Sequence, residues 1–188
     1  MSSRFKLNAS PAAVLLMALV FFFDTSGLIS AFVPAVLAHE LGHFLFLKVF
    51  HRRVTRLYLG FAGLEMDYAP RLEGAGSLLC AAAGPFFGGI YALIACSLPG
   101  DFWLVSGAAS FVLTVFNLLP VLPLDGGRIL LALVPAPAAR IISLIAAVLI
   151  LICGAITLVR YHTPVFILVS LWLALCNCSC FFQSADIE

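Results

Sequence analysis

The sequence predicts an all-α polytopic membrane protein with about six transmembrane helices. Of its 188 residues, 63% are hydrophobic and only 10% are charged, and the mean hydropathy is +1.15. Soluble domains carry about 25% charged residues, so this composition is that of a membrane protein. The apolar residues also gather in long segments separated by short polar stretches. The length suits a single integral membrane domain over residues 1–188.

Six apolar segments are expected to be helical and to span the membrane. They cover residues 11–23, 28–50, 72–98, 102–119, 141–159 and 163–182. The first segment follows two basic residues, a pattern that signal peptides share with retained spans. A retained span is favoured because Asp24 to Gly27 makes a poor cleavage site and leads directly into the next segment. If this short segment does not span the membrane, five transmembrane helices remain.

The polar, basic stretch 51–71 contains two runs with the composition of β-strands. Residues 54–59 and 64–68 flank Gly60-Phe61-Ala62-Gly63, which predicts a small membrane-associated β-hairpin over 54–68. The alternative is a basic loop at the membrane interface. A strand edge at this place could hold an extended peptide through main-chain hydrogen bonds.

Basic residues are distributed unevenly between the two faces of the predicted bundle. With six spans, one face holds both termini and nine of the ten lysines and arginines. Those nine are Arg4, Lys6, Lys48, Arg52, Arg53, Arg56, Arg71, Arg128 and Arg140, whereas Arg160 lies on the other face. The positive-inside rule assigns the basic face to the cytoplasm, so both termini are predicted to be cytoplasmic. A net charge of +1 gives no indication of nucleic-acid binding.

The six cysteines do not form a recognisable disulfide framework. Three of them, Cys176, Cys178 and Cys180, lie where the last apolar segment ends. Cysteines there can carry a lipid or bind a metal, or they can simply complete a helix, which is the commoner case.

The motif that carries chemistry is His39-Glu40-Leu41-Gly42-His43, inside the second apolar segment. Two histidines four residues apart lie on the same side of a helix and can bind one zinc ion. The glutamate between them can act as a general base on a water at the metal. A lone H-E-x-x-H also occurs by chance in soluble helices. Ionisable groups near the middle of a membrane segment, however, indicate a functional site.

A second polar position, Asp125, is predicted to provide the third zinc ligand. A catalytic zinc takes three protein ligands and leaves a fourth position for water. Besides Glu40, Asp125 is the only carboxylate within an apolar region, since the others fall in loops or tails. Two prolines three residues apart, Pro120 and Pro123, interrupt the helix before it. Irregular backbone at membrane depth is tolerated where it lines an interior site, so Asp125 should face such a site.

Three motifs in this order resemble the site-2 protease family of intramembrane zinc metalloproteases. They are H-E-L-G-H at 39–43, A-G-P at 83–85 and N-L-L-P-V-L-P-L-D-G-G-R at 117–128. The resemblance covers a core from about 28 to 128, and helices over about 141–182 complete the domain. It implies one zinc ion per chain, bound by His39, His43 and Asp125, with Glu40 as the catalytic base. It also implies that Asn117 contacts the substrate or the developing oxyanion.

The activity implied by this resemblance is hydrolysis of a peptide bond in or near the transmembrane segment of a single-span membrane protein. The chain shows no PDZ or CBS domain, so it resembles a minimal prokaryotic member in the cell membrane, for which regulation is expected from a membrane partner. The alternative is a non-proteolytic zinc-binding membrane protein, either a transporter or an inactive scaffold. A transporter should carry polar groups along its spans, whereas here they gather around one point. A different membrane zincin that cuts soluble or lipidated peptides is disfavoured by the D-G-G context.

Overall fold

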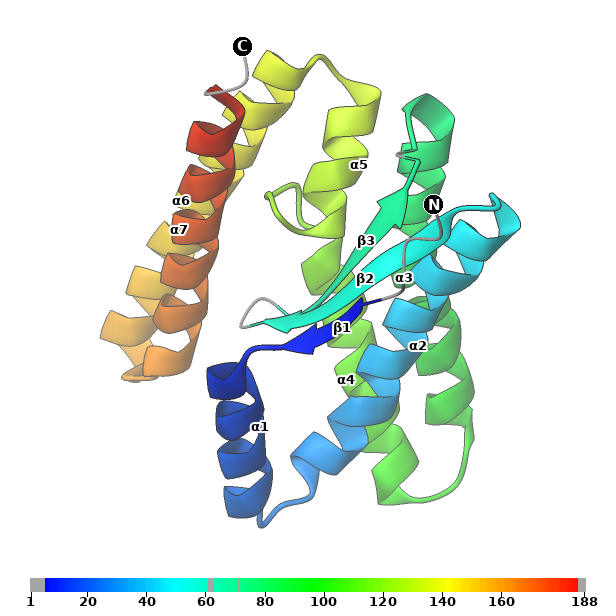
Figure 1. The fold of residues 1–188 in the computed structure, drawn as a ribbon. Coiled ribbons are helices and arrows are strands. Elements are labelled where there is room, and N and C mark those ends of the chain that lie inside the picture. The colour runs from blue at the N-terminus through cyan, green and yellow to red at the C-terminus, as the bar shows by residue number, and fades with distance from the viewer. Residues whose placement is uncertain (1–5, 61–62, 71, 186–188) are drawn as a thin grey trace. The chain divides into compact units, whose positions relative to one another are not determined.

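The computed structural model describes residues 6–60, 63–70 and 72–185, which fall into two compact units, Met1–Val115 and Phe116–Glu188. Within these ranges the chain forms seven helices and three strands (Figure 1). Phe61 and Ala62 of the predicted hairpin loop lie outside the described residues. The same holds for Arg4 and Arg71 of the predicted basic face and for the side chain of Cys180.

The first unit contains a small sheet and a group of helices. Its elements are β1 (Lys6–Ala9), α1 (Pro11–Phe23), α2 (Leu28–Val49), β2 (Arg53–Gly60), β3 (Gly63–Ala69), α3 (Gly74–Ser97) and most of α4 (Asp101–Asn117). The second unit contains α5 (Asp125–Leu133), α6 (Ala136–Tyr161) and α7 (Pro164–Ala185).

The predicted β-hairpin is present and has a third strand beside it. β2 and β3 pair antiparallel, with an irregularity in register between Val54 and Arg56. β1 pairs parallel with β2 on its other edge, so the strand order is β1-β2-β3 (Figure 1). Val54 and Tyr68 of the hairpin pack against a buried cluster of Leu47, Leu72 and Cys80. This cluster fixes the sheet to the C-terminal end of α2 and the N-terminal part of α3.

Helix α2 begins at a polar turn in which Asp24 accepts four hydrogen bonds. Its Oδ2 accepts one from the main-chain N–H of Ile29 (2.7 Å), and its Oδ1 accepts one from the Ser26 hydroxyl (2.7 Å). Two weaker bonds come from the main-chain N–H groups of Ser26 and Leu28. These bonds lower the pKa of the Asp24 carboxyl, the Ser26 hydroxyl contributing most. The carboxylate thereby satisfies N–H groups that a helix start leaves without intrahelical partners.

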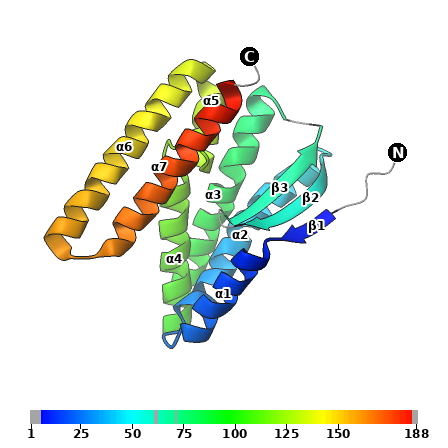
Figure 2. The same cartoon turned by 60° about the vertical axis from the view of Figure 1, so that its left-hand side comes forward.

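Helices α2, α3 and α4 pack closely because small residues line their contacts. α2 and α3 lie side by side (Figures 1 and 2). A side chain at Gly42 of α2 would place its Cβ 2.5 Å from the carbonyl oxygen of Ala83 on α3. The Ser110 hydroxyl of α4 donates to the carbonyl of Gly88 (2.8 Å), and the Tyr91 and Ser106 hydroxyls are hydrogen-bonded (2.8 Å). Close approach of small residues with interhelical hydrogen bonds is typical of membrane helices.

In the second unit, α6 and α7 form an antiparallel pair joined by a short turn (Figure 2). Gly154 of α6 allows this approach, since a Cβ there would lie 3.1 Å from Cα of Ile167 on α7. The residues that precede α5 belong to the same core, in which Val121 and Leu124 cluster with Ala147 of α6 and Leu173 of α7.

All six segments predicted to be helical are helices, and the predicted all-α membrane architecture is confirmed. By length and apolar composition α2, α3 and α6 could each cross a membrane, while α4 and Pro164–Ser179 are shorter apolar helices. Helix α1 has 13 residues, about 20 Å at 1.5 Å per residue, against a hydrocarbon core of about 30 Å. The seventh helix, α5, was not predicted, because the two glycines in its first turn are poor helix formers.

Candidate active site

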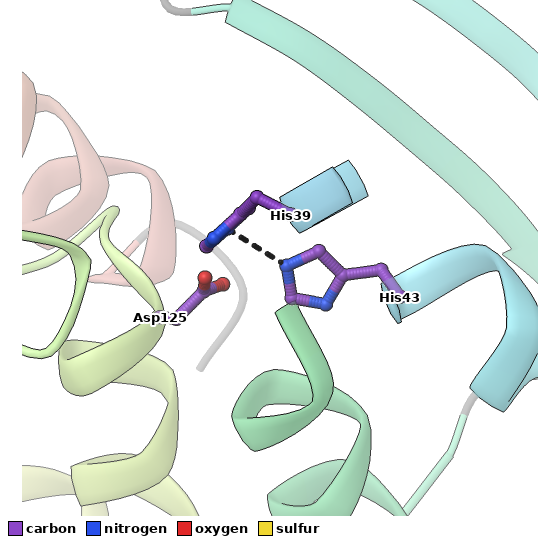
Figure 3. Close-up of side chains that lie close together, drawn as sticks. All are labelled: His39, His43 and Asp125. Carbon is purple, nitrogen blue, oxygen red and sulfur yellow. Dashed lines mark hydrogen bonds between the residues drawn. The ribbon is translucent and has the colours of Figure 1, made fainter. Parts of the chain in front are cut away.

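His39 and His43 lie on successive turns of α2 with their rings turned toward each other. Their Nε2 atoms are 3.3 Å apart, and the ring centroids are separated by 5.0 Å (Figure 3). His39 is buried and His43 is half-buried, as is Glu40 between them. Zinc–nitrogen bonds of about 2.0–2.1 Å at a tetrahedral angle require two ligand nitrogens about 3.3–3.4 Å apart. The observed Nε2 separation therefore fits two ligands of one tetrahedral ion.

The orientation of the His43 ring is set by α3. Its Nδ1 lies 2.8 Å from the main-chain carbonyl oxygen of Cys80. A carbonyl oxygen can only accept a hydrogen bond, so Nδ1 carries the proton and donates it. The lone pair of a neutral His43 is then on Nε2, the atom that faces His39. A metal-binding histidine commonly has such a partner on its second nitrogen, which fixes both the tautomer and the ring plane.

Glycines on α3 provide the space in which the two imidazoles lie. A Cβ at Gly84 would overlap the His43 ring, with Nε2 as the nearest atom and Cε1 at 2.6 Å. A Cβ at Gly88 would lie 2.7 Å from the Thr114 hydroxyl oxygen and 3.6 Å from His39 Nδ1. The A-G-P motif therefore does more than allow helices to approach, because its glycine is the surface against which the His43 ring lies.

In the second unit, Asn117 and Asp125 stand at the two ends of an irregular turn. Asn117 is the last residue of α4, and Asp125 is the first residue of α5 (Asp125 is labelled in Figure 3). Asp125 is only 5% exposed. A carboxylate in the first turn of a helix is stabilised by the positive end of the helix dipole. Asp125 is thus a buried acidic group that directly follows the interrupted backbone.

The glycine pair after Asp125 brings this turn into contact with α5. A Cβ at Gly126 would collide with the main chain of Leu118 and Leu119. One at Gly127 would lie 2.6 Å from the carbonyl carbon of Val121. Only residues without a side chain allow the turn to fold back over the start of α5 in this way. The turn before Asp125 and the first turn of α5 after it are consequently packed against each other.

Sequence reasoning missed two contributors to this site. The Cys80 carbonyl acts through the main chain, and no sequence pattern marks it. Gly84 entered the sequence analysis only as part of the A-G-P motif, and no role in placing a histidine was predicted for it.

The sequence and the fold were compared with known proteins. A model of peptidase family M50 matches residues 96–160, a segment that contains Asn117 and Asp125 but not the H-E-L-G-H motif. A match to this family implies a metalloprotease and a metal ion, typically zinc. No curated protein matches the sequence.

Among solved structures, the fold is similar to that of the site-2 protease from Methanocaldococcus jannaschii. The TM-score is 0.61 at 22% sequence identity, and the match covers 89% of this chain and 85% of that one. The chain thus has a fold similar to that of a site-2 protease and a segment that matches the model of the M50 peptidase family, and both findings agree with the resemblance to the site-2 protease family that its motifs indicated.

Proposed function

We propose that this protein is an intramembrane zinc endopeptidase, which hydrolyses a peptide bond in or near the transmembrane segment of a single-span membrane protein. The observation that carries the proposal is the pair of imidazole Nε2 atoms 3.3 Å apart in the middle of an apolar helix. Burying such groups in a membrane segment is expensive and indicates function. Glu40, next to His39 in the sequence, adds an ionisable group that a purely structural metal site would not need.

The proposed metal site uses His39, His43 and Asp125 and takes one zinc ion per chain. The three are chosen by residue type, because His39 and His43 face each other on one helix and Asp125 is a buried carboxylate. Two imidazoles and one carboxylate are the donor types of catalytic zinc sites that leave a position for water. Bound zinc would supply a Lewis acid that polarises water and the substrate carbonyl.

Glu40 and Asn117 are assigned the steps that the protein itself performs. Glu40 takes a proton from the attacking water and returns it to the nitrogen of the departing chain, since a carboxylate can act as base and then as acid. Asn117 offers an amide N–H to the oxyanion that develops on the substrate carbonyl, or it contacts the substrate main chain.

Cleavage within the membrane imposes a requirement on the substrate. A peptide bond within a helix is shielded by the helix, so the substrate must become locally extended before it is cut. The strand order makes β3 an edge strand, and an edge strand can hold an extended peptide by main-chain hydrogen bonds. Proline substitutions along the edge of β3 that faces away from β2 should therefore reduce cleavage, and unchanged cleavage would remove the sheet from the proposal.

The charge distribution supports a proposed orientation. We propose a prokaryotic cell membrane, as the resemblance to the site-2 protease family implies, with both termini in the cytoplasm on the basis of the positive-inside rule. We further propose that a membrane partner regulates access of the substrate to the site. Labelling of single cysteines added at each terminus, with a reagent that cannot cross the membrane, checks the orientation.

The experiment that tests the function compares the wild-type protein with Glu40→Gln. Both are purified in detergent, their zinc content is measured, and each is incubated with a panel of single-span membrane proteins. We expect about one zinc per chain in both samples and cleavage by the wild type alone. Zinc in both without cleavage of any substrate would favour a non-proteolytic zinc protein. A well-folded wild type without zinc would refute the proposal.

A further inference from the structure

Two polar residues buried in the last two helices hold the turn that leads to Asp125. Ser143 on α6 is 1% exposed, and Asn177 on α7 is 4% exposed. Polar side chains inside membrane helices are costly, and they usually have a function. Neither residue belongs to the motifs at 39–43, 83–85 or 117–128.

Both residues bind the main chain of Leu122, in the middle of the turn between α4 and α5. The Leu122 N–H donates to the Ser143 hydroxyl oxygen at 2.8 Å. The Asn177 side-chain amide donates to the Leu122 carbonyl at 3.3 Å and also to the Ser143 hydroxyl oxygen. Ser143 and Asn177 are therefore bonded to each other and to both polar groups of one peptide residue.

The need for these contacts follows from the prolines. Pro120 and Pro123 have no N–H and interrupt the helical hydrogen-bonding pattern on either side of Leu122. Main-chain groups that a helix no longer satisfies must find other partners at membrane depth. Ser143 and Asn177 supply those partners for Leu122.

The position of Leu122 is transmitted to Asp125 through a short and rigid connection. The N–H of Leu124 donates to the carbonyl of Val121 at 2.9 Å. A Cβ at Gly127 would lie 2.7 Å from the main-chain nitrogen of Leu122, so the turn lies directly on the first turn of α5. Val121 and Leu124 are buried among Ala147 and Leu173. A shift of Leu122 must therefore shift the start of α5.

We infer that Ser143 and Asn177 are positioning residues, which fix the Leu122 main chain and thereby hold the Asp125 carboxylate in place for metal binding. The inference rests on the proposed function, since it takes Asp125 as a ligand. It gives α6 and α7 a specific role in the site, although neither helix contributes a proposed ligand. Loss of groups that support metal ligands commonly weakens metal binding by about 10- to 100-fold.

The test measures the zinc affinity of the full-length protein in detergent, by competition with a chromogenic chelator. The variants are Ser143→Ala and Asn177→Leu, with Ser143→Thr to restore the hydroxyl group. Ser170→Ala is the matched control, because Ser170 is also fully buried on α7, and its hydroxyl donates to the carbonyl of Ile167 in its own helix (2.9 Å). Turnover is measured in parallel as kcat and KM.

We expect zinc affinity to fall by about 10- to 100-fold in Ser143→Ala and Asn177→Leu, with kcat reduced and KM unchanged. Ser170→Ala should match the wild type, and Ser143→Thr should recover most of the affinity. A substitution that merely lowers the folded fraction would reduce the number of zinc sites per chain, but it would not reduce the affinity of each remaining site. The affinity therefore separates positioning from a general loss of stability.

Two results would overturn the inference alone: wild-type zinc affinity in both Ser143→Ala and Asn177→Leu, or an equal loss in Ser170→Ala. A wild-type protein that is folded but binds no zinc would instead refute the proposed function, and the inference with it. Because that second failure is seen in the wild type, the two failures are distinguishable.

Discussion

Adding one methyl group to α3, by Gly84→Ala, should displace a proposed zinc ligand while leaving the helices in place. The new Cβ would point at the His43 ring, 2.6 Å from Cε1 and 2.7 Å from Cδ2. Carbon atoms in contact are separated by about 3.5–4.0 Å, so the ring must retreat by about 1 Å. The ring can move more easily than the backbone of α3, because it is attached by rotatable bonds.

The consequence for function can be estimated from this displacement. A ring that moves away from Gly84 changes the 3.3 Å separation of the two Nε2 atoms and strains the bond from Nδ1 to Cys80. A misplacement of about 1 Å at a catalytic group can cost about 100-fold in rate. We therefore expect a loss of cleavage of that order, and zinc affinity lower by at least about tenfold.

Gly89→Ala is the matched control for this substitution. It lies on the same helix, and a Cβ there meets nothing within 4 Å. The gain in helix propensity, about 1 kcal/mol, is the same at both positions and cancels in the comparison. Cleavage and chelator-competition assays on the two purified variants test the prediction. Wild-type zinc affinity and turnover in Gly84→Ala would refute the assignment of Gly84 as the surface that places His43.

Three further predictions concern the start of α2, the oxyanion and the metal. The lowered pKa of Asp24 means that its carboxylate stabilises the fold above the unfolded-state pKa of about 3.9 and that this contribution is lost as pH falls through the lower folded value. Asp24→Asn should therefore lower thermal stability at pH 7 and flatten its dependence on pH below about 4, and an unchanged profile would contradict this role. Asn117→Ala should reduce kcat by about 100- to 1,000-fold with zinc content unchanged; loss of zinc instead would place Asn117 at the metal. Prolonged treatment with a chelator should abolish cleavage and added zinc should restore it, whereas cleavage that survives complete zinc removal would exclude a zinc-dependent reaction.

The long helices could be predicted because their signals lie in continuous apolar segments. α2 was expected over 28–50 and is observed over Leu28–Val49. α6 begins earlier than the expected residue 141, at Ala136. Pro137 falls in its first turn, where a missing N–H is tolerated, so this proline starts the helix instead of preceding it.

Two elements were missed because their formation depends on distant residues. β1 has four residues and pairs with β2, which lies about fifty residues later in the sequence. Nothing local distinguishes it from the polar N-terminus around it. α5 begins with two glycines after Asp125, which local propensity disfavours. The close contact of those glycines with the main chain of residues 118–122 stabilises this helix despite their low helix propensity.

The candidate site likewise has features that local sequence predicts and features that depend on distant residues. The spacing of His39 and His43 could be interpreted from the sequence, because i and i+4 positions share one side of a helix. The partner of His43 Nδ1 could not, because it is a main-chain carbonyl 37 residues away. Ser143 and Asn177 were also unpredictable, as single polar residues in apolar helices give no indication of which main-chain group they satisfy.

The described interior is built from small residues, and this has a consequence for how the protein tolerates mutation. Its fully buried side chains include four serines, whereas many leucines and phenylalanines are exposed on helix surfaces. In lipid, large apolar side chains gain nothing from burial, and helices associate through close packing and hydrogen bonds between small residues. Enlarging Gly42 or Gly84 should therefore be more harmful than truncating an exposed residue such as Leu93, which is 74% exposed. A soluble protein shows the opposite order, because there the largest losses come from truncating large core side chains.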